Sequence, residues 1–423
     1  MRGASPYHGV DGPLVVSDHT DPHLLCEAFI ASAEADGCPR NDDFNGSNQE
    51  GAGYYQTTSF RGRRCSAAVA YLKPAKKRPN LRIVTNAHVL RIDFEGRRAI
   101  GVAWLRAGNE ERARGRCEVI LSAGAIGSPQ LLQLSGVGPA ELLRQHGIEL
   151  QCNSPGVGAN LQDHLQVRCV YRCNQSITFN DDFANPLRML GVAWRYLIHR
   201  RGPLTVSAGY AGAFLRSRPE ATRADVQLYF INYSTNRMGD RLHPFSGFTV
   251  SCCQLRPESR GSVRIRSNDP FAAPAIDPNY FSAPVDITAN LDGIKLIRRI
   301  LARAPICGFI KDEYLPGPAA IGDNQLLDYA RNTAGSLYHP TCTAGMGRDE
   351  YSVVDERLKV RGLDALRVID GSVMPILLSG NTHAGIVMIA EKGADMIIQD
   401  VERSVVGKIH APRFTSEPNG VAP

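Results

Sequence analysis

The alternation of apolar and polar positions predicts strands, a tight turn and a helix between residues 81 and 138. Residues 81–104 (LRIVTNAHVLRIDFEGRRAIGVAW) alternate around the turn EGRR, which is typical of a β-hairpin or meander. The run VIL then predicts a short buried strand, and SAGAIGS predicts a tight turn of small residues. The segment SPQLLQLS predicts a helix with Ser128 as its N-cap and Pro129 at its first position. Such a strand, turn and helix are how an α/β domain presents backbone groups to a ligand.

The pattern changes in residues 161–275, where short β-rich runs follow one another and one helix, near 187–200, interrupts them. These runs are LQVRCVYRC, VQLYFINYS, FTVSCCQL and GSVRIRS, and they predict a largely antiparallel sheet. A helix at 285–303 carries an apolar stripe that we expect in the core: Ile287, Leu291, Ile294, Ile297 and Leu301. The segment ALRVIDGSVMP then returns to a buried strand and a turn, and a last helix runs from about His383 to Gln399.

Together these elements predict an α/β fold (α+β overall) with two domains. Residues 59–160 and 335–400 are expected to form a discontinuous, doubly wound nucleotide-binding domain, and 161–334 a sheet-based substrate cap. Residues 1–58 are expected to form a loop-rich segment on the substrate domain, and 403–423 a disordered tail. The discontinuous domain requires strands 117–121 and 366–370 to share one sheet.

Composition and charge narrow the function classes. The chain has 423 residues, of which 43% are apolar and 21% charged, as in ordinary globular proteins. A net charge of +6 is weak support for a polyanionic partner, so we expect no nucleic acid partner. Eleven cysteines without a CxxC pair indicate free thiols in a reducing, cytoplasmic setting and no metal site. No apolar run approaches the ~18 residues that a membrane span needs.

Most of the common nucleotide-binding and catalytic motifs are absent from the sequence. GVGPAE (136–141) and GVGANL (156–161) each lack the third glycine of a dinucleotide fingerprint, and no G-x-S-x-G, Walker loop or HExxH is present. Nine isolated histidines are interpreted as surface or core residues: His8, His19, His23, His88, His146, His164, His199, His243 and His410. Two others have a distinctive context, His339 in SLYHPTCTAGMG and His383 in SGNTHAG.

Three segments carry a resemblance to a known family. GAIGSPQLLQLSGVG (124–138) resembles the second signature of the glucose–methanol–choline (GMC) flavin oxidoreductases. LYHPTCTAGMG (337–347) and RVIDGSVMPILLSGNTHAGIVMIAEKGADMI (367–397) resemble the family's C-terminal catalytic block, and the choline and alcohol dehydrogenase-like branch is the most similar. Members of the family open with a strand, G-x-G-x-x-G and a helix that bind the FAD pyrophosphate. This segment is missing, so we expect an N-terminally truncated member that holds FAD poorly.

The resemblance implies FAD-dependent oxidation of a primary alcohol, choline-like, aliphatic or aryl, with O2 or another electron acceptor. His339 is then the base that takes the hydroxyl proton, and His383 matches the second catalytic position, which holds the substrate oxygen. The implied FAD contacts are Asp370 and Gly371 through backbone N–H, Asn381 and Thr382 beside the ring, and Val89, Ser122 and Ala123 near the adenine. The start of the last helix would stabilise negative charge on the flavin ring.

Two other interpretations stay open at this point. One is a non-catalytic remnant that binds FAD weakly or not at all. The other is a hydroxynitrile lyase-type activity, because that chemistry also occurs on this scaffold. The sequence does not identify the alcohol, because the expected substrate pocket lies in the β-rich region, where no spacing rule applies.

Overall fold

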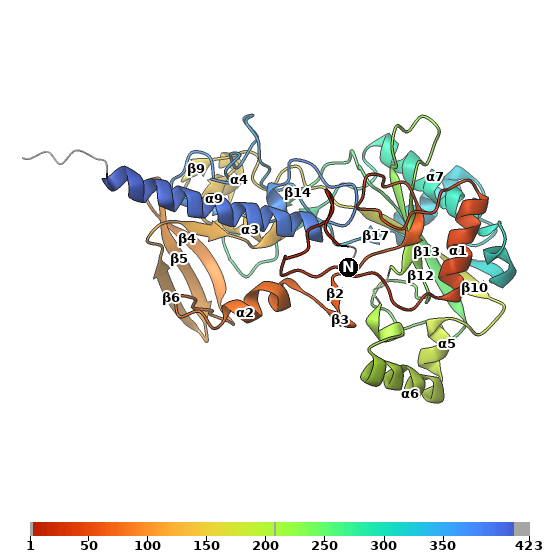
Figure 1. The fold of residues 1–423 in the computed structure, drawn as a ribbon. Coiled ribbons are helices and arrows are strands. Elements are labelled where there is room, and N and C mark those ends of the chain that lie inside the picture. Colours follow the sequence, from red (N-terminus) through yellow and green to blue (C-terminus); the bar gives the residue numbers. More distant parts are fainter. Residues whose placement is uncertain (1–2, 207–208, 410–423) are drawn as a thin grey trace, which may run out of the picture.

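An antiparallel sheet of seven strands forms one of the two lobes seen in Figure 1. The computed structural model describes residues 3–206 and 209–409, with side chains up to 403. Along the sheet the strands are β1 (Gly51–Tyr54), β11 (Ala211–Leu215), β12 (Val226–Ile231), β13 (Gly247–Gln254), β10 (Leu165–Cys173) and β16 (Ile310–Leu315), and β17 (Gly335–Ser336) also pairs with β10. The antiparallel sheet predicted for 161–275 is confirmed. The run GSVRIRS, however, pairs outside it, as β14 (Ser262–Arg264) with β15 (Ala275–Asp277).

The two faces of this sheet differ in chemistry. One face packs against α1 (Leu24–Ala35) and α7 (Pro284–Leu301) in the main hydrophobic core. Phe29 of α1 meets Phe230 of β12 with ring centroids 5.0 Å apart. The predicted α7 stripe is confirmed as core, with Ile287 the one member only partly buried. The alternate residues point to the opposite face, and many of them are buried and polar: Gln166, Arg168, Gln227, Tyr229 and Ser251.

The second lobe is built from smaller sheets. The predicted hairpin is confirmed as β4 (His88–Glu95) and β5 (Arg98–Arg106), extended by β6 (Asn109–Arg114). Strand β7 (Val119–Leu121) pairs in parallel with β18 (Leu366–Val368), and β8 (Val137–Gly138) with β9 (Cys152–Asn153). The β7–β18 pair puts strands from 117–121 and 366–370 in one sheet, as the predicted discontinuous domain requires. The domain boundaries themselves stay a prediction.

The helix after β7 differs from its predicted form. Helix α3 (Gly124–Leu134) begins with Ala123 as N-cap, and Pro129 lies inside it. Ser128 does not cap the helix because its hydroxyl bonds Asp370, 2.5 Å away. Pro129 has no N–H to offer the carbonyl four residues earlier, so the Ala125 carbonyl instead accepts the Thr343 hydroxyl at 2.7 Å.

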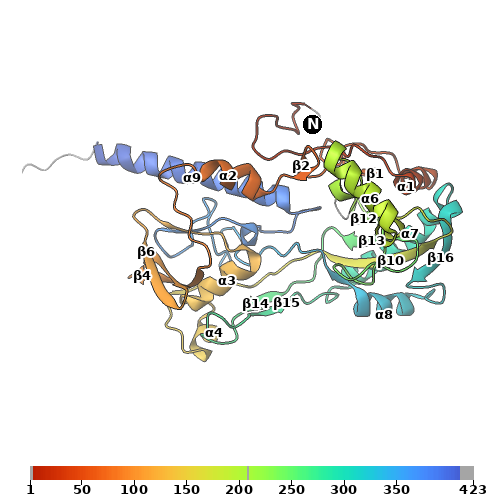
Figure 2. The ribbon, with the colours of Figure 1, turned by 90° about the horizontal axis from the view of Figure 1, so that it is seen from below.

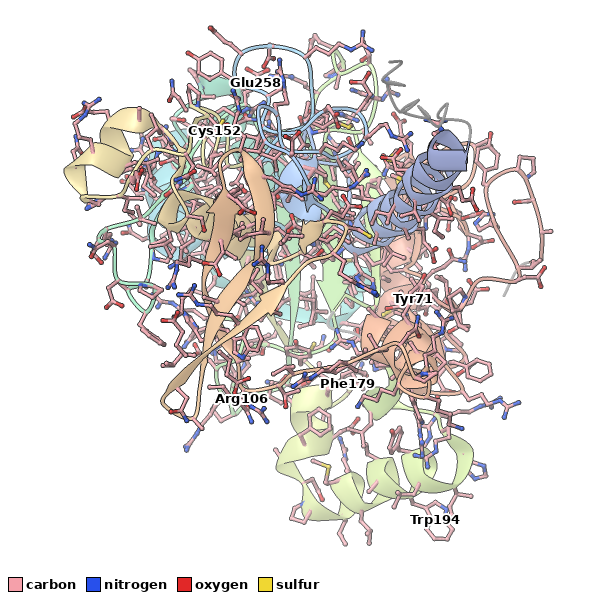
Figure 3. The ribbon with its side chains drawn as sticks, turned by 90° about the vertical axis from the view of Figure 1, so that its left-hand side faces the viewer. Tyr71, Arg106, Cys152, Phe179, Trp194 and Glu258 are labelled. Atoms are coloured by element: carbon pink, nitrogen blue, oxygen red, sulfur yellow. The ribbon has the colours of Figure 1, made fainter. Side chains whose placement is uncertain are left out.

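Helix α9 (His383–Ile409) starts between the lobes and runs outward over the smaller sheets (Figures 1 and 2). It continues beyond the expected end at Gln399, because Asp400 pairs with Arg357 at 2.7 Å and with Arg367 at 2.5 Å. Residues 403–409 of the expected tail are therefore helical, and the rest of it lies outside the described residues. Tyr71 lies beside α9 in Figure 3, and its hydroxyl bonds Glu391 of that helix.

The other elements complete the surface. They are β2 (Ser59–Phe60), β3 (Arg63–Arg64), α2 (Lys73–Ala75), α4 (Ala140–Gln145), α5 (Phe179–Ala184), α6 (Pro186–Trp194) and α8 (Asp323–Thr333), with short π or 3-10 turns at Ala68–Leu72, Arg195–His199, Pro203–Thr205, Ile306–Phe309 and Gly371–Val373. All eleven cysteines are free thiols, as predicted. In the described part of the chain no helix is long and apolar enough to cross a bilayer, and no cluster of potential ligands could hold a metal ion.

Candidate active site

His339 is fixed from several sides where the two lobes meet. Its side chain is 8% exposed. Its backbone N–H donates to Asp163 Oδ1 at 2.9 Å, and Asp163 Oδ2 accepts the hydroxyl groups of Ser336 and Tyr280, both at 2.5 Å. Its Nδ1 lies 2.8 Å from Nδ1 of His164. The histidine is therefore held in one orientation before any ligand binds.

The bonding partners of His164 determine which nitrogen of His339 carries the proton. His164 Nε2 lies 3.2 Å from the Leu255 carbonyl oxygen, which can only accept, so Nε2 must carry the His164 proton. His164 Nδ1 is then an acceptor, and His339 Nδ1 must donate to it. Burial lowers the pKa of His164 to about 3, so this ring is neutral at ordinary pH. The Nε2 of His339 is consequently left with a free lone pair.

Asn381 faces that lone pair. Its Nδ2 lies 3.4 Å from His339 Nε2, and its Oδ1 accepts the Tyr229 hydroxyl at 3.2 Å. Gln227 also donates to Asn381 Oδ1, at 3.5 Å. Tyr229 and Gln227 come from the polar face of the large sheet. That face, the start of α9 and the His339 segment therefore converge on one point.

His383, the second catalytic residue expected from the sequence, lies two positions further along. Its side chain is exposed, and within the described residues it forms no hydrogen bond or ion pair. The residue that contacts His339 is Asn381, which was expected beside the flavin ring. Burial lowers the pKa of His339, and the nearby Asp163 carboxylate opposes this shift.

His164 was interpreted from the sequence as an isolated core histidine and was missed as a site residue. It precedes β10, and β10 pairs with β17 through Leu165 and Ser336. This pairing brings together two histidines that lie 175 residues apart in the chain. Their distance in sequence and the short length of β17 leave no local pattern that could have indicated the contact.

Both carboxylate oxygens of Asp370 already accept hydrogen bonds from within the protein, so the side chain is not available to a ligand. Its Oδ2 accepts from the Gly124 N–H at 2.9 Å and from the Ser128 hydroxyl at 2.5 Å. Its Oδ1 accepts from the Ser372 N–H at 2.8 Å and the Ser372 hydroxyl at 2.5 Å. The carboxylate thus joins the β7–α3 turn to the β18 turn. Contact of a cofactor with the backbone N–H groups of Asp370 and Gly371 stays a prediction.

The β7–α3 turn has the form expected of a dinucleotide site. Ser122 and Ala123 are exposed at the carboxyl end of β7. Gly124 has φ +77°, and a Cβ atom at this position would meet no atom within 4 Å, so the backbone can be approached closely. Val89 on β4 is 38% exposed, and Thr382 is 5% exposed at the start of α9. An exposed turn whose backbone can be approached closely is compatible with contact to a dinucleotide.

Comparison with known proteins places the chain in a family. Family models of the GMC oxidoreductases match residues 4–166 and 257–390. An alcohol dehydrogenase [acceptor] of Pseudomonas putida is 40% identical over 400 residues, covering 94% of this chain and 72% of the relative. The mitochondrial choline dehydrogenase of Mus musculus is 41% identical over 397 residues, covering 93% of this chain and 66% of the relative. An oxygen-dependent choline dehydrogenase of Serratia proteamaculans is 40% identical over 98% of this chain and 74% of its own length.

Solved structures agree with this assignment. A formate oxidase of Aspergillus oryzae, studied for the modification of its FAD, aligns with TM-score 0.87 and 26% identity over 93% of this chain and 73% of that chain. A fungal aryl-alcohol oxidase aligns with TM-score 0.81 and 25% identity over 93% of this chain and 73% of that chain. Membership implies a flavin cofactor and, in general, the oxidation of alcohols. The chain thus belongs to the GMC oxidoreductase family, among relatives that are choline and alcohol dehydrogenases.

Proposed function

We propose that this protein oxidises a primary alcohol with FAD, and that His339 is the base that takes the hydroxyl proton. The observation that carries the proposal is the position of His339 Nε2, which faces the Asn381 amide at 3.4 Å while Nδ1 of the same ring contacts His164 at 2.8 Å. FAD, when bound, supplies the acceptor for the hydride that leaves the alcohol carbon. His339 Nε2 accepts the hydroxyl proton, and Asn381 Nδ2 donates a hydrogen bond to the oxygen as negative charge develops there.

We assign the cofactor contacts in the same way. Ser122, Ala123 and Val89 would hold the adenine end, and the Gly371 backbone the phosphate or ribitol. Thr382 and the first N–H groups of α9 would face the flavin ring, where the positive end of the helix dipole stabilises negative charge. In this proposal residues 59–160 and 335–400 carry FAD, and 161–334 contact the alcohol.

The geometry supports Asn381 as the partner of the base, whereas the resemblance pointed to His383. The rate of anaerobic flavin reduction by an alcohol, in the flavin-loaded full-length enzyme, separates the two. His339→Ala should lower this rate at least ~100-fold, the lower range for a positioned general base. Asn381→Ala should lower it strongly as well, and His383→Asn only mildly. His199→Ala is the matched control, because His199 is exposed on the short π turn after α6.

Each outcome has a distinct meaning. A His339→Ala enzyme that reduces flavin at the wild-type rate would remove the base from the proposal. A larger loss in His383→Asn than in Asn381→Ala would restore His383 as the second catalytic residue. If no alcohol reduces the wild-type flavin, oxidation itself is refuted. Release of an aldehyde from a cyanohydrin without flavin reduction would then identify a lyase, and loss of both activities a remnant.

A further inference from the structure

Arg168 is a buried cation that has no counter-charge among the described residues. It lies on β10 with 7% of its surface exposed, and its Nε and Nη2 atoms are buried without any hydrogen bond. It forms no ion pair with the described residues. Burial lowers its pKa, but a guanidinium remains charged in proteins. A buried charge without a counter-charge is strongly unfavourable, so a site of this kind is normally completed by an anion.

The strand places Arg168 on the same face of the sheet as the candidate active site. Side chains alternate along a strand, so His164, Gln166 and Arg168 share one side. His164 contacts His339 directly. Four residues of strand span ~13 Å, which is the separation of the His164 and Arg168 backbones along β10.

The strand register across the sheet gives a second estimate of the distance between Arg168 and the candidate active site. Arg168 is paired with Ser251, and Ser251 with Tyr229, whose hydroxyl donates to Asn381. Two strand spacings amount to ~10 Å between the backbones of Arg168 and Tyr229. The long Arg168 side chain therefore belongs to the buried polar face over His339 and Asn381, several bond lengths from the point of reaction.

Building on the proposed function, we propose that Arg168 binds the anionic end of the substrate, and that this substrate is an alcohol carrying a carboxylate several bonds from its CH–OH group. A guanidinium can donate two parallel hydrogen bonds to a carboxylate, and two of its buried nitrogens have no other partner. The same charge repels a quaternary ammonium group. Choline, the substrate named for several relatives, should consequently be a poor substrate of this protein.

The groups that interact electrostatically with Arg168 are Tyr233, Tyr329 and Asp240, and Tyr233 and Asp240 come from the loop between β12 and β13. Asp240 attracts the guanidinium electrostatically, but its carboxylate accepts the Arg237 N–H at 3.1 Å and makes no ion pair with Arg168. His243, from the same loop, has a lowered pKa, first through burial and then through the charge of Arg168. Asp240 is therefore the carboxylate, among the residues that the structure describes, that the test must address.

The test compares 6-hydroxyhexanoate, 1-hexanol and choline as reductants of the flavin-loaded full-length enzyme. In the wild type, kcat/KM for 6-hydroxyhexanoate should exceed that for 1-hexanol by ~10- to 100-fold, the range for hydrogen bonds to a charged group. Arg168→Met should remove this preference and leave 1-hexanol oxidation nearly unchanged, whereas Arg168→Lys should keep part of it. Arg172→Met is the control, because Arg172 lies further along the same strand and already pairs with Asp312 at 2.7 Å.

Calorimetric titration with hexanoate provides a readout that does not depend on turnover. Hexanoate should bind the wild type and Arg168→Lys, and should bind Arg168→Met at least ~10-fold more weakly. Equal kcat/KM for the two alcohols in the wild type, or an unchanged preference in Arg168→Met, would overturn the assignment. A preference that appears only in Asp240→Asn would assign the guanidinium to Asp240 and overturn it as well. If neither 6-hydroxyhexanoate nor 1-hexanol reduces the flavin while hexanoate still binds through Arg168, the proposed function fails and the anion site stands.

Discussion

Replacing His164 should weaken His339 as a base although His339 itself is unchanged. In His164→Phe the acceptor for the His339 Nδ1 proton disappears, whereas in His164→Asn the side-chain oxygen occupies nearly the place of Nδ1 and can still accept. His164→Phe should therefore slow anaerobic flavin reduction by the alcohol, and His164→Asn should restore most of the rate. Because His164 faces His339 and the backbone of Leu255 and Leu378, KM for the alcohol should change little.

The magnitude follows from the bond that is lost. A neutral hydrogen bond contributes ~0.5–1.5 kcal/mol, and leaving a buried donor unpaired costs ~1–3 kcal/mol. Since 1.36 kcal/mol corresponds to tenfold, the fraction of His339 in the base-competent tautomer should fall by ~10- to 100-fold. The loss should stay smaller than that of His339→Ala, because some of the rings still adopt the active form.

Two measurements examine this reasoning. Stopped-flow reduction gives the rate, and 15N NMR of the imidazole nitrogens gives the tautomer. The wild type should show a protonated Nδ1 and an unprotonated Nε2 on His339, and His164→Phe should show a mixture of tautomers. A His164→Phe enzyme with the wild-type rate and the wild-type nitrogen spectrum would refute the tautomer argument. A slow enzyme with an unchanged spectrum would show that His164 acts through packing alone.

Three further outcomes are expected. The acid limb of kcat/KM should lie below pH 6.5, because burial lowers the pKa of His339 and keeps the base neutral. An acid limb at or above pH 6.5 would contradict a lowered pKa of His339. Asp370→Ala should lower the free energy of unfolding in urea by at least ~3 kcal/mol, because four donors, three of them buried, lose their acceptor. An unchanged urea midpoint would contradict the role of this carboxylate. His23 caps α1 by accepting the Leu25 N–H at 3.2 Å, and burial lowers the pKa of His23 to about 4. As the pH falls, His23 is therefore protonated in the unfolded chain before it is protonated in the folded one. The free energy of unfolding should consequently decrease as the pH falls from 6.5 to about 4. His23→Asn should retain the cap and flatten this decline in the urea midpoint, and an equally steep decline would exclude His23 as its source.

The elements with strong local patterns were predictable. The hairpin around EGRR, the α7 stripe and the positions of strands β7 and β18 each follow from periodicity over a few residues. The predicted burial holds for β18 but not for β7, where Leu121 is buried and Ile120 is 46% exposed. The β7–α3 junction was not predictable, because Ser128 in isolation is a good N-cap and Pro129 is a good first helical residue. A carboxylate 242 residues away, on Asp370, takes the Ser128 hydroxyl instead.

The candidate site was predictable only in part, for a similar reason. The context of His339 carries a resemblance, and the residues around His383 mark the start of a helix. Whether Asn381 or His383 turns towards His339 depends on how α9 meets the polar face of the large sheet. The contact with His164 depends on pairing between β10 and β17. Both are long-range packing outcomes, and no local spacing encodes them.

The segment that carries His339 is also the joint between the lobes. Its first half bonds Asp163 and the His164 carbonyl beside the large sheet. Its second half bonds the β18 turn, where the Ala344 N–H donates to the Ser372 carbonyl at 2.8 Å, and the Thr343 hydroxyl donates to the carbonyl that Pro129 leaves free. The base is thus assembled only when both lobes have folded and docked. A change that loosened the docking of the lobes would leave the secondary structure of each lobe largely in place but no working histidine. Activity should therefore report docking more sensitively than any spectroscopic measure of helix or strand.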